Sequence, residues 1–205
     1  MRVIDCVEID TWISRKKKAM NRNRVTVIDG SFSTQLSKHV GIVDGDPLWS
    51  SRFNATNPDA VIQTHLDFLR AGAEVILTNT YQASVEGYVE HLKLDRNEAI
   101  ALIKASVQLA HVAKERFLKE DQSNKEPQII ASIGPYGAHL HDASEYTGSY
   151  ADNITVDALK KWHRVRINAV LQAGVDGLAI ETIPCRVCRI QLKWRTNRKR
   201  AFPCR

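Results

Sequence analysis

No stretch of the 205-residue sequence contains the roughly 18 consecutive apolar residues that a membrane-spanning helix needs. The sequence also lacks the Gly-x-Gly-x-x-Gly pattern of dinucleotide-binding folds and the glycine–lysine pattern of P-loops, which argues against a nucleotide-phosphate enzyme. The N-terminus contains Asp5, Glu8 and Asp10 and no apolar segment followed by small residues. We therefore expect neither a membrane span nor a secretory signal.

Cysteine is scarce: the chain has only Cys6, Cys185, Cys188 and Cys204. So few cysteines without a secretory signal predict a reducing, cytoplasmic location. Cys185 and Cys188 form a Cys-x-x-Cys pair, but a structural zinc site needs four ligands and the basic surroundings do not resemble a redox motif. His139 and His141, two residues apart in one loop, could also chelate a metal. Metal or redox chemistry at either pair stays open as an alternative to a plain structural or solvated role.

The net charge of +6 is unevenly distributed along the chain. Residues 1–24 contain seven Lys or Arg against three Asp or Glu, and residues 186–205 contain eight Lys or Arg and no acid. Residues 25–185 contain fourteen basic and twenty acidic residues, so this part is mildly acidic. We therefore divide the chain into a basic N-terminal extension, 1–24, one domain, 25–185, and a basic C-terminal tail, 186–205. Nucleic-acid binding is not expected of the domain, and stays an alternative only for the basic tails.

Four short apolar segments predict buried parallel strands at residues 25–29, 74–78, 128–133 and 177–181. Their starts recur about every 50 residues, and amphipathic stretches at 57–69, 95–119 and 155–173 lie between them. A strand–helix alternation of this kind is typical of α/β folds in which crossover helices join parallel strands. Two long polar loops, 38–57 and 134–153, follow the first and third strands and predict either functional loops or packing lids.

The helix predictions rest on capping signals and on apolar spacing. Asn57 and Pro58 are typical of a helix N-terminus, and Gly72 and Gly174 stand where helix C-caps belong. The residues expected to face the core are Val61, Ile62, Leu66, Leu69, Ile100, Ile103, Val107, Ala110, Phe117, Leu159, Trp162, Val165 and Val170.

Polar residues follow the C-terminal end of each predicted strand. Because ligands of parallel α/β folds bind at the carboxyl ends of strands, these positions predict a binding site. Asp29 and Glu181 would place two carboxylates in one pocket with no matching Lys or Arg, which suits a ligand with an ammonium group. Helix capping or a loop ion pair is the alternative role for each acid. Gly30 would let a ligand approach the backbone closely.

Seven segments taken together resemble the homocysteine S-methyltransferase family, in order and at similar spacing. They are residues 28–36 (IDGSFSTQL), 46–50 (DPLWS), 65–73 (HLDFLRAGA), 78–84 (TNTYQAS), 132–138 (SIGPYGA), 144–148 (SEYTG) and 181–185 (ETIPC). The likeness covers residues 25–185. It favours the branch that uses S-methylmethionine or S-adenosylmethionine over the branch that uses betaine.

The resemblance implies a (β/α)8 TIM barrel, of which this sequence contains about the first four β/α units. It also implies a zinc ion that binds the homocysteine sulfur as a thiolate, which attacks the methyl group of a sulfonium donor to give methionine. Asp29, the Gly30 backbone and Glu181 match positions that hold the amino-acid end of homocysteine, and Tyr81 matches an aromatic position lining that pocket. From its chemistry, Trp49 is expected beside the sulfonium through cation–π attraction.

The sequence departs from the family pattern at the metal. The family's three zinc cysteines lie in Gly-x-Asn-Cys and Gly-Gly-Cys-Cys stretches, which do not occur here, so no metal ligand is assigned. Residues 186–205 have no family likeness, and we expect a truncated, inactive form. Four strands cannot close an eight-stranded barrel, so open sheet edges predict self-association or poor solubility. A non-catalytic fragment, or a regulatory partner of the full-length enzyme, is the alternative function.

Overall fold

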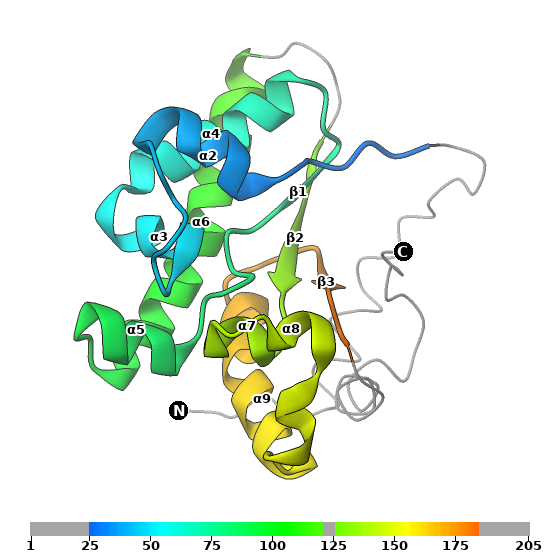
Figure 1. Ribbon diagram of the computed structural model, residues 1–205. Coiled ribbons are helices and arrows are strands. Elements are labelled where there is room, and N and C mark those ends of the chain that lie inside the picture. Colours follow the sequence, from blue (N-terminus) through cyan, green and yellow to red (C-terminus); the bar gives the residue numbers. More distant parts are fainter. Residues whose placement is uncertain (1–24, 121–125, 185–205) are drawn as a thin grey trace.

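The computed structural model describes residues 25–120 and 126–184, in which helices pack against a three-stranded sheet (Figure 1). The strands are β1 (Val75–Leu77), β2 (Gln128–Ile133) and β3 (Gly177–Ile180). The helices are α2 (Phe32–Val40), α3 (Phe53–Thr56), α4 (Pro58–Arg70), α5 (Val85–Leu92), α6 (Arg96–Glu120), α7 (Gly137–Leu140), α8 (Ser144–Thr147) and α9 (Val156–Gln172), with short 3-10 helices η1 (Trp49–Arg52) and η2 (Ser149–Asp152).

The strands pair in parallel in the order β1-β2-β3, which confirms the predicted α/β arrangement. Ile76 of β1 pairs with Ile129 of β2, and Ile133 of β2 pairs with Ile180 of β3. Helix α6 connects β1 to β2 and α9 connects β2 to β3, and these two helices pack on each other. Figure 1 shows α4 and α6 on one side of β1 and β2, and α7 and α8 beyond the end toward which β2 points.

The prediction of a buried strand at residues 25–29 is wrong. This segment lies alongside β1 and forms a single parallel bridge, between Ile28 and Val75. Val25 is 83% exposed, Val27 51% and Ile28 50%, so their side chains stay largely in contact with solvent. An apolar run is buried only where other elements cover both of its faces, and within the described ranges this edge of the sheet is not covered in that way.

The three predicted helices form, and α4 begins at the predicted cap. The Asn57 side chain accepts a hydrogen bond from the Ala60 N–H at the start of α4, and the Thr155 side chain accepts one from the Ala158 N–H at the start of α9. Gly72 and Gly174 follow α4 and α9 with φ of 101° and 95°, left-handed values that a side chain would oppose. Both long loops contain short helices, and α2 follows the first segment. Among the described helices, none is long and apolar enough to span a membrane.

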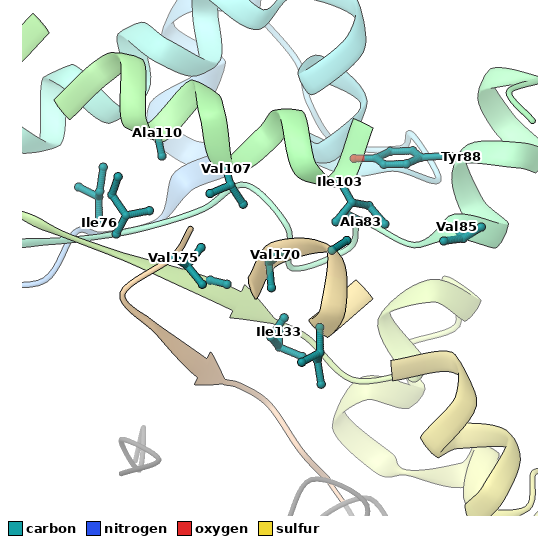
Figure 2. Close-up of a cluster of buried hydrophobic side chains, with 14 of the residues drawn as sticks. Ile76, Ala83, Val85, Tyr88, Ile103, Val107, Ala110, Ile133, Val170 and Val175 are labelled. Atoms are coloured by element: carbon teal, nitrogen blue, oxygen red, sulfur yellow. The ribbon is translucent and has the colours of Figure 1, made fainter. Parts of the chain in front are cut away.

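The main core lies between α6, α9 and the sheet, and it includes most residues predicted to face inward. Figure 2 shows Ile103 and Val107 of α6 directed toward Val170 and Ile133. Leu159 is also fully buried, whereas Trp162 is only partly buried. In place of Trp162, α9 buries the polar side chains of His163 and Arg166, which apolar spacing alone did not predict.

A buried histidine in α4 makes the fold sensitive to acid. The His65 ring is fully buried 4.8 Å from the Phe32 ring, and neither ring nitrogen has a hydrogen-bond partner among the described residues. Burial lowers the pKa of His65 from 6.5 to about 3. Between pH 6.5 and pH 3, His65 is therefore protonated in the unfolded chain but not in the folded chain. The free energy of unfolding falls as the pH falls through this range.

We predict that His65→Leu removes much of this acid sensitivity. Between pH 7 and pH 5 the wild-type chain should lose up to about 2 kcal/mol of unfolding free energy through this one group. Urea unfolding midpoints at fixed protein concentration measure the loss at each pH. His111→Leu, at a partly exposed position of α6, is the control and should keep the wild-type pH dependence. Equal pH dependence in all three chains would contradict the prediction.

Candidate functional site

Asp29 follows the bridge at Ile28, and its carboxyl group lies against the C-terminal end of β1. The Leu77 N–H donates to Asp29 Oδ2 at 2.7 Å. Asp29 Oδ1 is buried and has no hydrogen-bond partner in the described part of the chain. Burial raises the pKa of Asp29 to about 7, the Leu77 hydrogen bond opposes this rise, and the charge of Glu181 adds to it. One face of this carboxyl group is therefore held by the backbone while the other lacks a partner.

Glu181 stands at the corresponding end of β3. Its N–H donates to the Ile133 carbonyl at 3.1 Å, and its Oε1 accepts a hydrogen bond from Ser132 Oγ at 2.7 Å. Burial raises the pKa of Glu181, and the Ser132 hydrogen bond lowers it in part. Within the described residues, no Lys or Arg forms an ion pair with Asp29 or Glu181. Two partly buried acids that repel each other and lack a cation favour a positively charged ligand.

Tyr81 follows β1 and shares the surroundings of Glu181. Its side chain hydrogen-bonds with that of Thr182, and burial raises the pKa of the Tyr81 phenol to about 12, with the charge of Glu181 as a smaller cause. A Cβ atom at Gly134 would lie 2.6 Å from the Tyr81 carbonyl oxygen, so only glycine fits there. The structure thus places Asp29, Tyr81 and Glu181 together at the end of the sheet where the strands have their carboxyl ends, as the polar residues after each strand predicted.

Gly30 and Trp49 lie in less enclosed positions. Gly30 is exposed, and a Cβ atom there would lie 3.4 Å from the Phe68 ring, which is close to ordinary contact. A ligand contact with its backbone stays a prediction. Trp49 opens η1 with a φ of 47°, a left-handed value that is strained for tryptophan. Strain of this kind persists where the surroundings impose it, often at functional sites.

A buried amide network holds the segment that contains Trp49 against the end of β1. Asn79 Nδ2 donates to the Ser50 carbonyl at 2.8 Å, and Ser50 Oγ donates to Asn79 Oδ1 at 2.7 Å. Asn79 Nδ2 also donates to Asn54 Oδ1 at 3.0 Å, and Asn54 Nδ2 donates to the Asn79 carbonyl at 2.9 Å. The sequence placed Asn79 at a strand end, but only the structure shows that it joins this end to η1.

Arg166 was missed by the sequence analysis. It lies on α9 with 2% of its surface exposed, and it donates to backbone carbonyls that follow β1 and β2. The signal in the sequence was an arginine in helical register with Leu159 and Val170, on the face predicted to be apolar.

The described residues do not supply a metal site. No group of three or more His, Cys, Asp or Glu side chains in residues 25–120 and 126–184 could hold a metal ion. The ring centroids of His139 and His141 lie 6.2 Å apart, but the two rings are not part of such a group. All four cysteines lie outside the described residues, so chemistry at Cys185 and Cys188 stays untested.

Comparisons with known proteins agree on one family. The homocysteine S-methyltransferase family model matches residues 26–194. The betaine-homocysteine S-methyltransferase of Drosophila melanogaster is 62% identical over 160 residues, which are 76% of this chain and 48% of that protein. Homocysteine S-methyltransferase 1 of Arabidopsis thaliana is 41% identical over 163 residues, covering 77% of this chain and 49% of that protein. The chain therefore spans about half the length of the curated relatives that it matches.

A solved structure extends this agreement to the fold. The metallated form of the homocysteine methyltransferase MmuM from Escherichia coli matches with a TM-score of 0.77 and 37% sequence identity. The match covers 85% of this chain and 60% of the MmuM chain.

We predict that the Asp29 carboxyl group titrates near pH 7, several units above an ordinary aspartate. Glu181→Gln should lower the pKa of Asp29, because it removes the neighbouring negative charge, but the pKa should stay above 3.8 because burial remains. NMR titration of carboxyl-labelled aspartate measures both midpoints, and Asp29→Asn identifies the resonance. Asp157→Asn, at an exposed position in the first turn of α9, should change neither. A wild-type midpoint near 4 would contradict this site.

Proposed function

Because the chain belongs to the homocysteine S-methyltransferase family, we propose that its described residues form the homocysteine-binding part of an enzyme that methylates homocysteine to methionine. The observation that carries the proposal is the pair of partly buried carboxyl groups, Asp29 and Glu181, each with a raised pKa. We take the three parallel strands to belong to a (β/α)8 TIM barrel.

The proposed role of the acid pair is to bind the ammonium group of homocysteine. Asp29 Oδ1 lacks a hydrogen-bond partner among the described residues, and an ammonium group would supply one. The same cation would stabilise the charged form of both carboxyl groups and so offset the effect of their burial. Tyr81 would line this pocket beside Glu181, and the Gly30 backbone would contact the amino-acid end of the ligand.

The proposed reaction moves one methyl group between two sulfur atoms. The homocysteine sulfur forms a bond to the methyl carbon while the donor's sulfur–methyl bond breaks, and the bonding electron pair stays on the donor sulfur. The thiol proton must leave first, because a free thiol has a pKa of about 8.5 and is mostly protonated at neutral pH. The family resemblance implies that a zinc ion serves this purpose by binding the sulfur as a thiolate. The described residues do not fit a zinc site, so no step is assigned to a metal here.

We propose a sulfonium compound, S-methylmethionine or S-adenosylmethionine, as the methyl donor. Trp49 supports this choice, because an aromatic face attracts a cation and its strained backbone is fixed beside the end of β1. The relatives' names differ on this point, since the Drosophila protein is named for betaine. A cytoplasmic location, the division at residues 24 and 185, and the absence of nucleic-acid binding by the acidic domain remain further parts of the proposal.

The exposed edge at residues 25–28 favours a second, non-catalytic role. Exposed apolar side chains at the edge of a sheet favour pairing with another chain. The chain could then associate with itself or with a full-length enzyme of the family, in place of acting alone.

We predict that the purified chain binds homocysteine and that Glu181→Gln weakens this binding about 30-fold or more, as is typical when one partner of a buried charge pair is removed. Isothermal titration calorimetry measures both affinities. 4-Mercaptobutyrate, which lacks the amino group, should not bind. Glu120→Gln is the matched control, because it breaks only the exposed Arg70–Glu120 ion pair between α4 and α6. Wild-type affinity in Glu181→Gln would contradict the proposed role of the acid pair.

With homocysteine, S-methylmethionine and zinc supplied, we expect no methionine above background from this chain, since its sequence contains neither of the two cysteine stretches that hold zinc in the family. Product analysis by mass spectrometry makes the test. Turnover that Glu181→Ala abolishes would mean that other residues of this chain supply the metal ligands, and would contradict the expectation of an inactive form.

We predict that Val25→Lys, at the exposed sheet edge, lowers self-association. The charged side chain opposes edge-to-edge pairing, so the average mass at a given concentration should fall. Light scattering over a concentration series measures it. Ile42→Lys is the control, since Ile42 is 88% exposed in the loop after α2 and is not part of a strand. A monomeric wild-type chain with a cooperative thermal transition would contradict the open-edge prediction.

A further inference from the structure

A buried arginine lies directly behind the strand ends that form the candidate site. Arg166 of α9 donates from Nη1 to the Gly134 carbonyl at 3.0 Å, and from Nη2 to the carbonyls of Thr80 at 2.8 Å and Tyr81 at 2.9 Å. Thr80 and Tyr81 follow β1, whereas Gly134 follows β2. One guanidinium group therefore joins the segments that leave two neighbouring strands.

The position of this bridge is significant because the strand ladder ends just before it. The last backbone hydrogen bond between the end of β1 and β2 runs from the Thr78 N–H to the Ile130 carbonyl at 3.0 Å. Beyond that point side-chain hydrogen bonds join the two segments: the Ser132 N–H donates to Thr78 Oγ1 at 3.2 Å, and Thr80 Oγ1 donates to the Ser132 carbonyl at 2.7 Å. Arg166 adds the bonds that lie farthest along both segments, at Thr80, Tyr81 and Gly134.

The surroundings of Arg166 are unusual for a structural arginine. Its hydrogen bonds go to neutral carbonyl groups, and no described Asp or Glu forms an ion pair with it. Its guanidinium carbon lies 4.7 Å from the centre of the Trp162 ring, which provides a cation–π contact. Burial of a cation without a carboxylate partner is unfavourable, so a side chain that served packing alone would be better apolar.

We propose that Arg166 is a positioning residue for homocysteine binding, which sets the location of the Tyr81 phenol by fixing the carbonyls of Tyr81 and Gly134. This inference rests on the proposed function. The two segments pack directly against each other, because even a Cβ atom at Gly134 would collide with Tyr81. A shift of either segment therefore moves Tyr81 relative to Thr182, its hydrogen-bond partner, which adjoins Glu181.

The planar shape of the guanidinium group explains why arginine is needed. Two of its nitrogens reach three carbonyls on two segments at once, whereas a lysine ammonium is a single point that cannot span the same separation. Lysine keeps the positive charge and can retain part of the hydrogen bonding. The homocysteine affinity of Arg166→Lys should therefore lie between that of the wild type and that of a variant without any charge at this position.

The test compares Arg166→Met and Arg166→Lys with Ile167→Ala. Ile167 is the next residue of α9, is 3% exposed and packs in the main core, so its truncation destabilises the same helix without removing any of the three hydrogen bonds of Arg166. Homocysteine affinity is measured by calorimetry. Hydrogen exchange of peptides covering residues 78–84 and 134–138 reports the order of the two segments independently of any ligand.

We expect homocysteine affinity to fall by about 10-fold to 100-fold in Arg166→Met, the range seen when a group that orients a metal ligand is lost. Arg166→Lys should recover part of this affinity. In Arg166→Met, hydrogen exchange should rise more at residues 78–84 and 134–138 than in the core strands. Ile167→Ala should keep near-wild-type affinity although it is destabilised. If Arg166→Met does not fold, the test rests on the homocysteine affinity and hydrogen exchange of Arg166→Lys compared with those of Ile167→Ala.

Two results would overturn the inference. Equal affinity and equal exchange at the two segments in Arg166→Lys and wild type would show that the bridge does not position Tyr81. Equal losses in Ile167→Ala and the Arg166 variants would show a purely structural role. If the wild-type chain does not bind homocysteine at all, the proposed function fails, and hydrogen exchange alone decides whether Arg166 holds the two segments.

Discussion

Parallel pairing of the strands is the constraint on which the candidate site depends. Because the strands run in the same direction, the residues that follow each strand meet at one edge of the sheet. Asp29, Tyr81 and Glu181 are separated by about 50 and 100 positions along the chain, yet they reach the same edge. The hydrogen bond from the Leu77 N–H to Asp29 fixes one acid there, and that from Ser132 fixes the other.

The same geometry makes the two acids unfavourable in the absence of a ligand. Both are partly buried, and burial raises the pKa of each. Among the described residues neither has a cationic partner, so part of the folding free energy is spent on holding them together. Binding sites commonly contain such groups, since a complementary ligand then gains from relieving the repulsion. An amino acid carries the required ammonium group, which links this electrostatic arrangement to the family's substrate.

Local signals in the sequence predicted the parts of the fold that depend on short-range physics. Asn57, Gly72 and Gly174 marked helix ends correctly, because capping depends on backbone groups a few residues away. The sequence also predicted the shared location of the strand ends. It did not predict the exposure of residues 25–28 or the burial of Arg166, because both depend on which distant elements cover a side chain. The basic ends stay predictions, since residues 1–24 and 186–205 fall outside the described residues.

The central claim is that the carboxyl groups of Asp29 and Glu181 bind the ammonium group of homocysteine. Calorimetry in buffers of different ionisation enthalpy, at pH 6 without metal, measures the protons released on binding. Because the pKa of Asp29 is about 7, the free site is partly protonated at pH 6. The account predicts proton release on binding that disappears at pH 8.5 and in Asp29→Asn. Homocysteine binding at pH 6 without proton release would contradict it.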